Sequence, residues 1–154
     1  MSTLILFEDL HDALSSIWLG RFYATTLPKV PSYPCGVYTV LAGEAFLTLC
    51  GPSDLTRFRI RVDCFAKDYR EVIGHRDSVI ESMMRFKYQN EKVSEFEMYE
   101  DAVDVYRKML DFSVYFNELA AGPAAANRNA KESNHGRLQV ASVLRAEHAD
   151  PDRG

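Results

Sequence analysis

Apolar and charged residues alternate along residues 55–65, and the spacing of the apolar residues then changes to that of a helix. The first segment places apolar side chains on every second position and charged ones between them: Phe58, Ile60, Val62 and Cys64 alternate with Arg57, Arg59, Arg61 and Asp63. Successive side chains of a strand point to opposite faces, so we expect a strand with one apolar and one charged face. Apolar residues recur at steps of three and four over residues 69–84, which predicts an amphipathic helix with Asp68 as its N-cap and Glu71 at the capping-box position.

The N-terminal part of the chain predicts a helix, a short strand and a loop. Residues 4–18 are strongly apolar with helical spacing, so we expect a short helix that begins near Ser2 or Thr3 and ends at Gly20. Residues 21–24 fit a short edge strand. Three prolines then follow within seven residues: Pro28, Pro31 and Pro34. Because such a segment can neither be helical nor supply a regular hydrogen-bond ladder, it should be an extended loop.

Residues 35–50 contain two strand-like runs, 36–41 and 45–49, with Gly43 and Glu44 between them. They form either a hairpin or one long strand that bends at a bulge. We favour the long bent strand, because both halves are apolar. Gly-Pro-Ser-Asp at residues 51–54 predicts a turn. The strand that follows should therefore pair antiparallel with the one before it.

The remaining elements complete an α+β domain. Residues 87–92 read as a polar connection, 93–99 as a strand, 100–104 as an acidic turn and 105–116 as a further strand. The predicted order is α-β-β-(β)-α-β-β, a twisted, mostly antiparallel β-sheet packed against two helices on one face. We assign residues 1–118 to this domain. Residues 119–154, where the composition changes, are expected to be a linker and C-terminal extension with a short helix at 138–148.

Composition and charge narrow the functional classes. The 154 residues carry a formal charge of −4, whereas nucleic-acid-binding domains are usually basic. No apolar run approaches the roughly 20 residues that span a bilayer, so no membrane association is expected. The N-terminus lacks the features of a secretory signal, and three widely spaced cysteines do not make a disulfide framework. Synthesis in a reducing cytoplasm is the default expectation.

Catalytic and metal-binding patterns are not evident in the sequence. The histidines show no ligand spacing with one another or with the cysteines: His11, His75, His135 and His148, and Cys35, Cys50 and Cys64. The cysteines are expected to be small buried hydrophobes. The acidic pairs, Glu95 with Glu97 and Asp101 with Asp104, read as solvated side chains. We expect no enzyme activity, no metal and no cofactor.

The row of Arg57, Arg59 and Arg61 is the feature most open to a functional interpretation. The row either contacts an acidic or phosphate-bearing partner, or forms the solvent face of a strand. In the second case Glu95 and Glu97, or Asp111, would balance its charge across the ladder. We favour the second interpretation, and otherwise a subunit interface, with little weight on DNA because the chain is acidic.

A series of local patterns carries a resemblance to a known family. They occur in a fixed order: the loop from Leu27-Pro28 to Pro34, Gly36-Val-Tyr-Thr-Val, Gly51-Pro-Ser-Asp-Leu-Thr56, Arg61-Val-Asp-Cys-Phe-Ala66, Tyr69-Arg-Glu-Val72 and Arg107-Lys-Met-Leu-Asp-Phe-Ser-Val-Tyr-Phe116. Over residues 27–117 the chain thereby resembles the small tail-completion, or tail-terminator, proteins of long-tailed bacteriophages and related tail-like particles. The run over residues 51–72 is the most specific part. The extension from Leu119 departs from the compact family pattern.

The resemblance implies a structural virion protein that assembles with itself, commonly as a hexamer, into a ring at the head-proximal end of the tail tube. Such a ring ends tube polymerisation and joins the tail to the head connector, or stopper, protein. DNA would pass through its lumen without sequence-specific binding, and the protein would move from the host cytoplasm into the virion. Turn chemistry adds candidate contact residues to the arginine row: Pro28, Pro31, Pro34, Glu44, Ser53 and Asp54.

Two alternatives remain open at this point. One is a head-completion adaptor or stopper protein, which a mainly helical subunit would support. The other is a small cytoplasmic enzyme or ligand-binding domain, which would need a convergent pocket around His75, Cys64 or the acidic pairs.

Overall fold

The fold was analysed in a computed structural model that describes residues 2–118. The elements follow the order α1 (Ser2–Ser15), η1 (Ser16–Trp18), β1 (Phe22–Ala24), β2 (Cys35–Thr48), β3 (Gly51–Ala66), α2 (Tyr69–Met84), β4 (Asn90–Glu100) and β5 (Val105–Asn117). This order confirms the predicted α+β class. The expected linker, extension and helix at 138–148 lie outside the described residues, so that part of the domain assignment stays a prediction.

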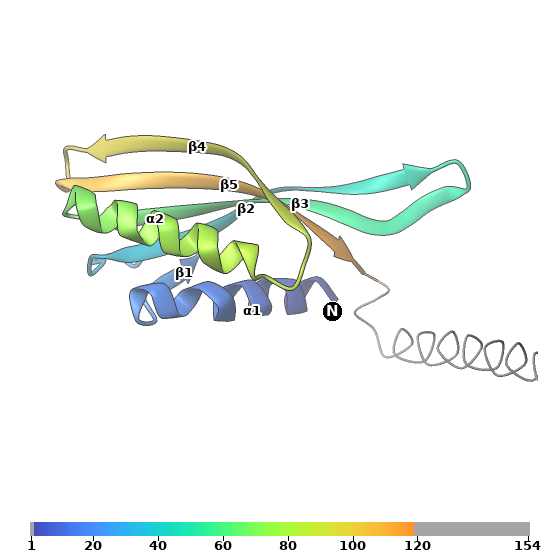
Figure 1. Cartoon of the computed structure of the whole chain (residues 1–154), viewed down its shortest axis with the longest axis horizontal. Helices are drawn as coiled ribbons and strands as arrows, with labels where there is room; N and C mark the ends of the chain where they lie inside the picture. The colour runs from blue at the N-terminus through green and yellow to red at the C-terminus, as the bar shows by residue number, and fades with distance from the viewer. Residues whose placement is uncertain (1, 119–154) are drawn as a thin grey trace, which may run out of the picture. The chain divides into compact units, whose positions relative to one another are not determined.

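The five strands form one mixed sheet in the order β1-β2-β3-β5-β4. Only the short edge strand β1 runs parallel to its neighbour, and the other neighbouring pairs are antiparallel. Both helices lie against the same face of the sheet (Figure 1). The central strands β3 and β5 therefore have one face under the helices and one face turned away from them. Neither helix has the length and apolarity that a membrane crossing requires.

The core lies between the helices and the sheet, where the sequence pattern places it. The apolar face of β3 is buried, and α1 and α2 cover it with their own apolar stripes: Leu6, Leu10 and Leu14 from α1, and Val72, Val79 and Met83 from α2. Asp68 caps α2 as predicted, its carboxylate accepting a hydrogen bond from the backbone N–H of Arg70 at 3.2 Å. Trp18 is fully buried, and its ring lies so close to Gly36 that a Cβ there would be 2.7 Å from ring carbons.

The proline-rich segment is a loop, as expected, and it covers part of the opposite face of the sheet. Tyr23, Leu27 and Tyr33 pack there against a cluster of buried residues at one end of the sheet: Cys35, Val37, Phe65 and Val105. The face that the arginine row suggested to be polar is therefore apolar at this end. Phe65 continues the alternation of β3, yet the loop shields it from solvent.

Residues 35–48 form a single long strand, which confirms the preferred interpretation. Register irregularities fall between Val40 and Ala42 and between Ala45 and Leu47. The predicted turn at 51–54 is wrong, because these residues already belong to β3. The turn instead lies at residues 49–50, where Thr48 pairs with Gly51, whose φ of +124° favours glycine. Pro52 is tolerated because β5 no longer flanks β3 at this point.

Candidate assembly surface

The tip of the β2–β3 hairpin extends beyond the rest of the sheet. Pairing of β5 with β3 reaches only to Leu55, and pairing of β1 with β2 reaches only to Tyr38. Residues 45–54, which we call the arm, therefore form a two-stranded ribbon that none of the other described strands flanks. Figure 1 shows the hairpin projecting past both helices.

The arm exposes large apolar side chains. Leu47 is 82% exposed, Leu49 is fully exposed, and Phe46 is about two-fifths exposed. A two-stranded hairpin is at best marginally stable in water by itself. Full burial of one leucine contributes about 1.5–3 kcal/mol, and neither leucine gains this from its contacts within residues 2–118. The arm thus has the composition of a contact surface.

The arginine row lies on the sheet face away from the helices, and its three members differ in their surroundings. Arg57 forms an ion pair with Glu44 across the β2–β3 ladder. Arg61 donates two hydrogen bonds to the carboxylate of Asp111, at 2.7 and 3.0 Å, and Ser94 donates a third at 3.1 Å. The guanidinium of Arg61 lowers the pKa of Asp111. Arg59 is exposed and takes part in none of the ion pairs found within residues 2–118.

Of the three acidic residues expected to balance the arginine row, one is confirmed and two are wrong. Asp111 balances Arg61, but Glu95 and Glu97 face the opposite way. Glu95 lies across from Leu110 and Glu97 across from Lys108, so both are on the helix side of the sheet. There Glu95 binds Arg76 of α2, and Glu97 binds Lys108. An irregularity between Lys92 and Ser94 sets this register, which the sequence pattern does not reveal.

The structure brings some of the candidate contact residues together and separates others. Ser53 and Asp54 belong to the arm, and Glu44 and Arg57 form its base. Pro28, Pro31 and Pro34 lie by the start of β2, at the end of the sheet opposite the arm. Leu47, Leu49 and the exposed Cys50 were missed as contact residues. The available signal was the apolar run at 45–50, which lacks the alternation of a half-buried strand.

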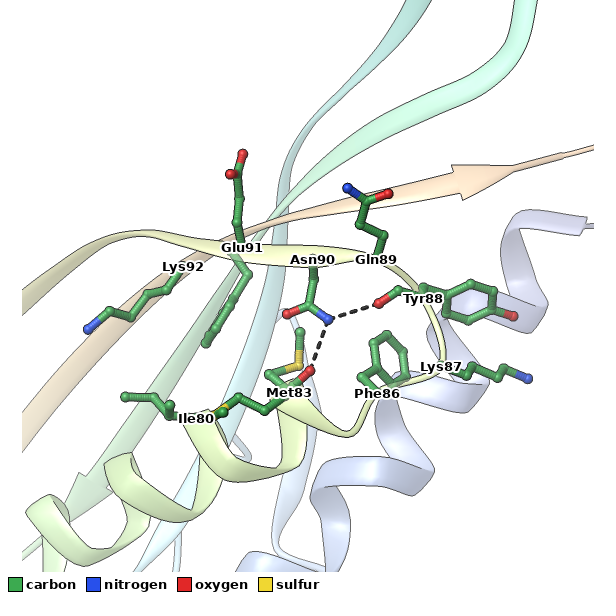
Figure 2. Close-up of a pocket in the computed structure, with 11 residues that line it drawn as sticks. Ile80, Met83, Phe86, Lys87, Tyr88, Gln89, Asn90, Glu91 and Lys92 are labelled. Carbon is green, nitrogen blue, oxygen red and sulfur yellow. Dashed lines mark hydrogen bonds between the residues drawn. The ribbon is translucent and has the colours of Figure 1, made fainter.

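A groove of about 460 Å³ lies where α2 ends and β4 begins. Its apolar lining includes Ile80, Met83, Met84 and Phe112, and residues 86–92 complete it. Figure 2 shows Asn90 pointing from β4 toward the end of α2. Its side-chain amide donates to the backbone oxygens of Met83 and Tyr88, both at 2.9 Å. We call this the α2–β4 groove.

The residues considered as candidates for catalysis or metal binding lie in packing contacts, hydrogen bonds and ion pairs. His75 packs against Trp18, and burial lowers its pKa. Cys64 is buried, which raises the pKa of its thiol, whereas Cys50 is exposed, contrary to expectation. Asp104 accepts a hydrogen bond from Tyr99 in the turn before β5. His135 and His148 lie outside the described residues. Within residues 2–118, no group of three histidine, cysteine or acidic side chains is placed to hold a metal ion.

Comparisons with known proteins add little. No family model matches the chain, and the comparison with characterised protein sequences gives no match. Among solved structures, a chain of the virion of a native gene transfer agent particle is similar, with a TM-score of 0.45 and 8% sequence identity. The alignment covers 71% of this chain and 89% of that chain. At this TM-score the similarity carries no argument about function.

Proposed function

We propose that the chain is a structural subunit of a phage-like virion, which assembles with copies of itself into a ring at the head-proximal end of the tail tube. The ring ends polymerisation of the tube and joins the tail to the head connector protein. The observation that carries the self-assembly is the arm, with Leu47 and Leu49 exposed on a two-stranded ribbon. The sequence resemblance over residues 27–117 supplies the place of the ring in the virion.

A ring requires two different contact surfaces on each subunit, because only head-to-tail contacts close into a ring of more than two copies. The fold offers such surfaces on its two sides. Among residues 2–118, β2 has no outer neighbour beyond Tyr38, and β4 forms the opposite edge of the sheet. β4 also exposes apolar side chains, among them Phe96 and Met98. Unpaired strand edges with apolar side chains favour contacts with another chain.

The proposed partners are the tail tube protein on one face of the ring and the head connector on the other. DNA passes through the lumen without sequence-specific binding. The formal charge of −4 supports an acidic or neutral lumen, which would let DNA slide because such a surface does not attract its phosphates. A head-completion adaptor is less well supported, since the subunit is built on a five-stranded sheet and is not mainly helical.

The test is the assembly state of the purified full chain, followed by its effect on tube growth. We expect light scattering to give a closed oligomer and electron microscopy to show rings of the diameter of a tail tube. Added to polymerising tail tube protein, the rings should cap the tubes and shorten their mean length. A persistent monomer would refute the ring, and rings that leave tube length unchanged would refute the terminator role.

A further inference from the structure

Two surface features of the domain expose apolar side chains, the arm and the α2–β4 groove. Within residues 2–118, the arm exposes Leu47 and Leu49, and the groove is an apolar hollow with Met84 82% exposed at its wall. They are separate surfaces of the same chain. Each leaves apolar surface exposed to solvent, the arm on a projection and the groove in a depression.

We propose that the arm of one copy docks into the α2–β4 groove of the next copy, with Leu47 and Leu49 as the anchors. The proposal rests on the self-assembly proposed above and names the two surfaces that meet. A contact between an arm and a groove joins different surfaces of the two copies. It is therefore heterologous, and repeated copies form a ring when the rotation between neighbours closes.

The size of the groove suits this occupant. A cavity of about 150 Å³ accommodates one benzene-sized group. The groove, at about 460 Å³, has room for two groups of that size together with some of the backbone that carries them. Ile80, Met83 and Phe112 supply an apolar lining, and methionine side chains adapt readily to a partner.

The charges of the two surfaces are complementary. The arm, residues 45–54, contains Asp54 and no lysine or arginine, and Glu44 at its base is paired with Arg57. At the groove, Lys87 and Lys92 remain 57% and 36% exposed although each binds one acid within the chain. Glu91 is the acid nearest to them in sequence, but Figure 2 shows it pointing away from α2. The contact would thus bring Asp54 of the arm to a groove whose rim carries two exposed lysines.

The groove is held in shape before any partner arrives. The two hydrogen bonds from Asn90 tie the first residue of β4 to the end of α2 and to the connection between them. Tyr88 packs edge-on against Phe86 and Phe116, and its hydroxyl donates to Asp9 at 2.7 Å. A groove that is already ordered loses little conformational entropy on binding. More of the free energy gained by burying the leucines therefore contributes to affinity.

The test uses one arm variant and one groove variant in the full chain. Leu49→Asp and Met84→Asp each replace an exposed side chain, so both should keep the melting temperature that the parent protein has at a concentration too low for assembly. Each should weaken assembly by at least about 100-fold, because an apolar anchor is lost and a charge is placed in the contact. Val30→Asp is the matched control, since Val30 is 88% exposed on the proline-rich loop away from both surfaces. It should leave assembly unchanged.

Mixing the two variants identifies the partners. The Met84→Asp copy keeps an intact arm, and the Leu49→Asp copy keeps an intact groove, so one contact can form between them. We expect two monomeric variants to combine into a one-to-one heterodimer that cannot grow into a ring. Light scattering measures this directly. A mixture that stays monomeric would show that arm and groove are not partners and would overturn the proposal.

A disulfide between copies would test the same contact between arm and groove. A Met84→Cys variant should form a disulfide between copies with the exposed Cys50 of the arm under mild oxidation, and Cys50→Ser should abolish it. The failures are distinguishable. Rings that tolerate both aspartate variants would overturn the arm–groove contact and leave the proposed function standing. A parent protein that stays monomeric at every concentration would overturn both.

Discussion

Glu95 holds helix α2 against the edge strand β4, and its replacement by glutamine gives a quantitative test of the fold. The Glu95 carboxylate accepts two hydrogen bonds from Arg76 of α2, at 2.9 and 2.8 Å, and one from Lys92 at 2.7 Å. The ammonium of Lys108 lies 3.7 Å away. These partners, Arg76 foremost, lower the pKa of Glu95 from 4.5 to about 2, although partial burial acts in the opposite direction.

The pKa shift sets the size of the expected effect. The difference between 4.5 and about 2 corresponds to about 3 kcal/mol of stabilisation of the ionised form. The carboxylate is one-fifth exposed, so solvent screening reduces the contribution to about 1–2 kcal/mol. Glu95→Gln should therefore lower the free energy of unfolding by about 1–2 kcal/mol at pH 7. For a domain of this size the melting temperature should fall by about 4–8 °C.

The pH dependence has a defined sign. Because the pKa of Glu95 is lower in the folded state, its contribution is complete above pH 4.5 and is lost as the pH falls toward 2. Urea unfolding followed by circular dichroism, at one low protein concentration, measures both proteins at pH 7 and at pH 3. The difference between the parent protein and Glu95→Gln should shrink to less than about half at pH 3.

Glu97→Gln is the matched control, because Glu97 lies on the same strand and the same face. Glu97 binds only Lys108 among the described cations and is 42% exposed, so its loss should cost less than about 1 kcal/mol. Equal losses for the two variants, or a Glu95→Gln difference that does not change with pH, would show that the Arg76–Glu95 pair does not hold α2 in the way described.

Three further predictions follow from single contacts. Gly36→Ala should lower the free energy of unfolding by about 1–3 kcal/mol, measured by urea unfolding, because the new Cβ would meet the Trp18 ring at 2.7 Å; an unchanged midpoint would contradict this packing. In the Leu49→Asp variant, whose arm should be undocked, Ellman's reagent should modify Cys50 rapidly and spare Cys35 and Cys64, which are buried, with the pKa of Cys35 raised to about 11 and that of Cys64 also raised; rapid loss of all three thiols would contradict it. Arg59→Glu should lower stability by no more than about 1 kcal/mol in a thermal melt, because Arg59 has no ion pair among residues 2–118 and acts on Asp111 only through a weaker charge interaction; a loss of rings in a variant that still folds would place Arg59 in an interface.

The hydrophobic pattern alone predicts the position of those helices and strands that have one apolar and one polar face. Alternation located β3 and β5, helical spacing located α1 and α2, and Asp68 marked the start of α2. These signals are local, since each side chain's direction follows from its own backbone. The strand–helix unit at residues 55–84 could therefore be predicted together with the side chains that it buries between sheet and helices.

The sequence does not predict the exposure of a side chain where that exposure depends on which other segments lie beside its strand. The apolar residues at 45–49 read as a core strand, because a pattern does not show that β1 and β5 end before the arm begins. The side of the sheet that Glu95 faces depends on one irregularity in β4. The burial of Phe65 on the otherwise charged face depends on a loop more than 30 residues earlier in the chain. The last two are tertiary effects without a local signature, whereas the arm has one local signal, the apolar run at 45–50 that lacks alternation.

The bends of β2 connect the fold to the geometry of the proposed ring. Bulges bend a strand and increase its twist, and the two irregularities in β2 lie at the base of the arm and within it. In a head-to-tail contact the direction of the arm relative to the groove sets the rotation between neighbouring copies. Head-to-tail contacts end in a ring only for a rotation that closes, and otherwise continue as a filament. A protein that stops the growth of a tube cannot itself form an open filament. The bent arm is therefore the part of the chain in which closure of the ring would be encoded.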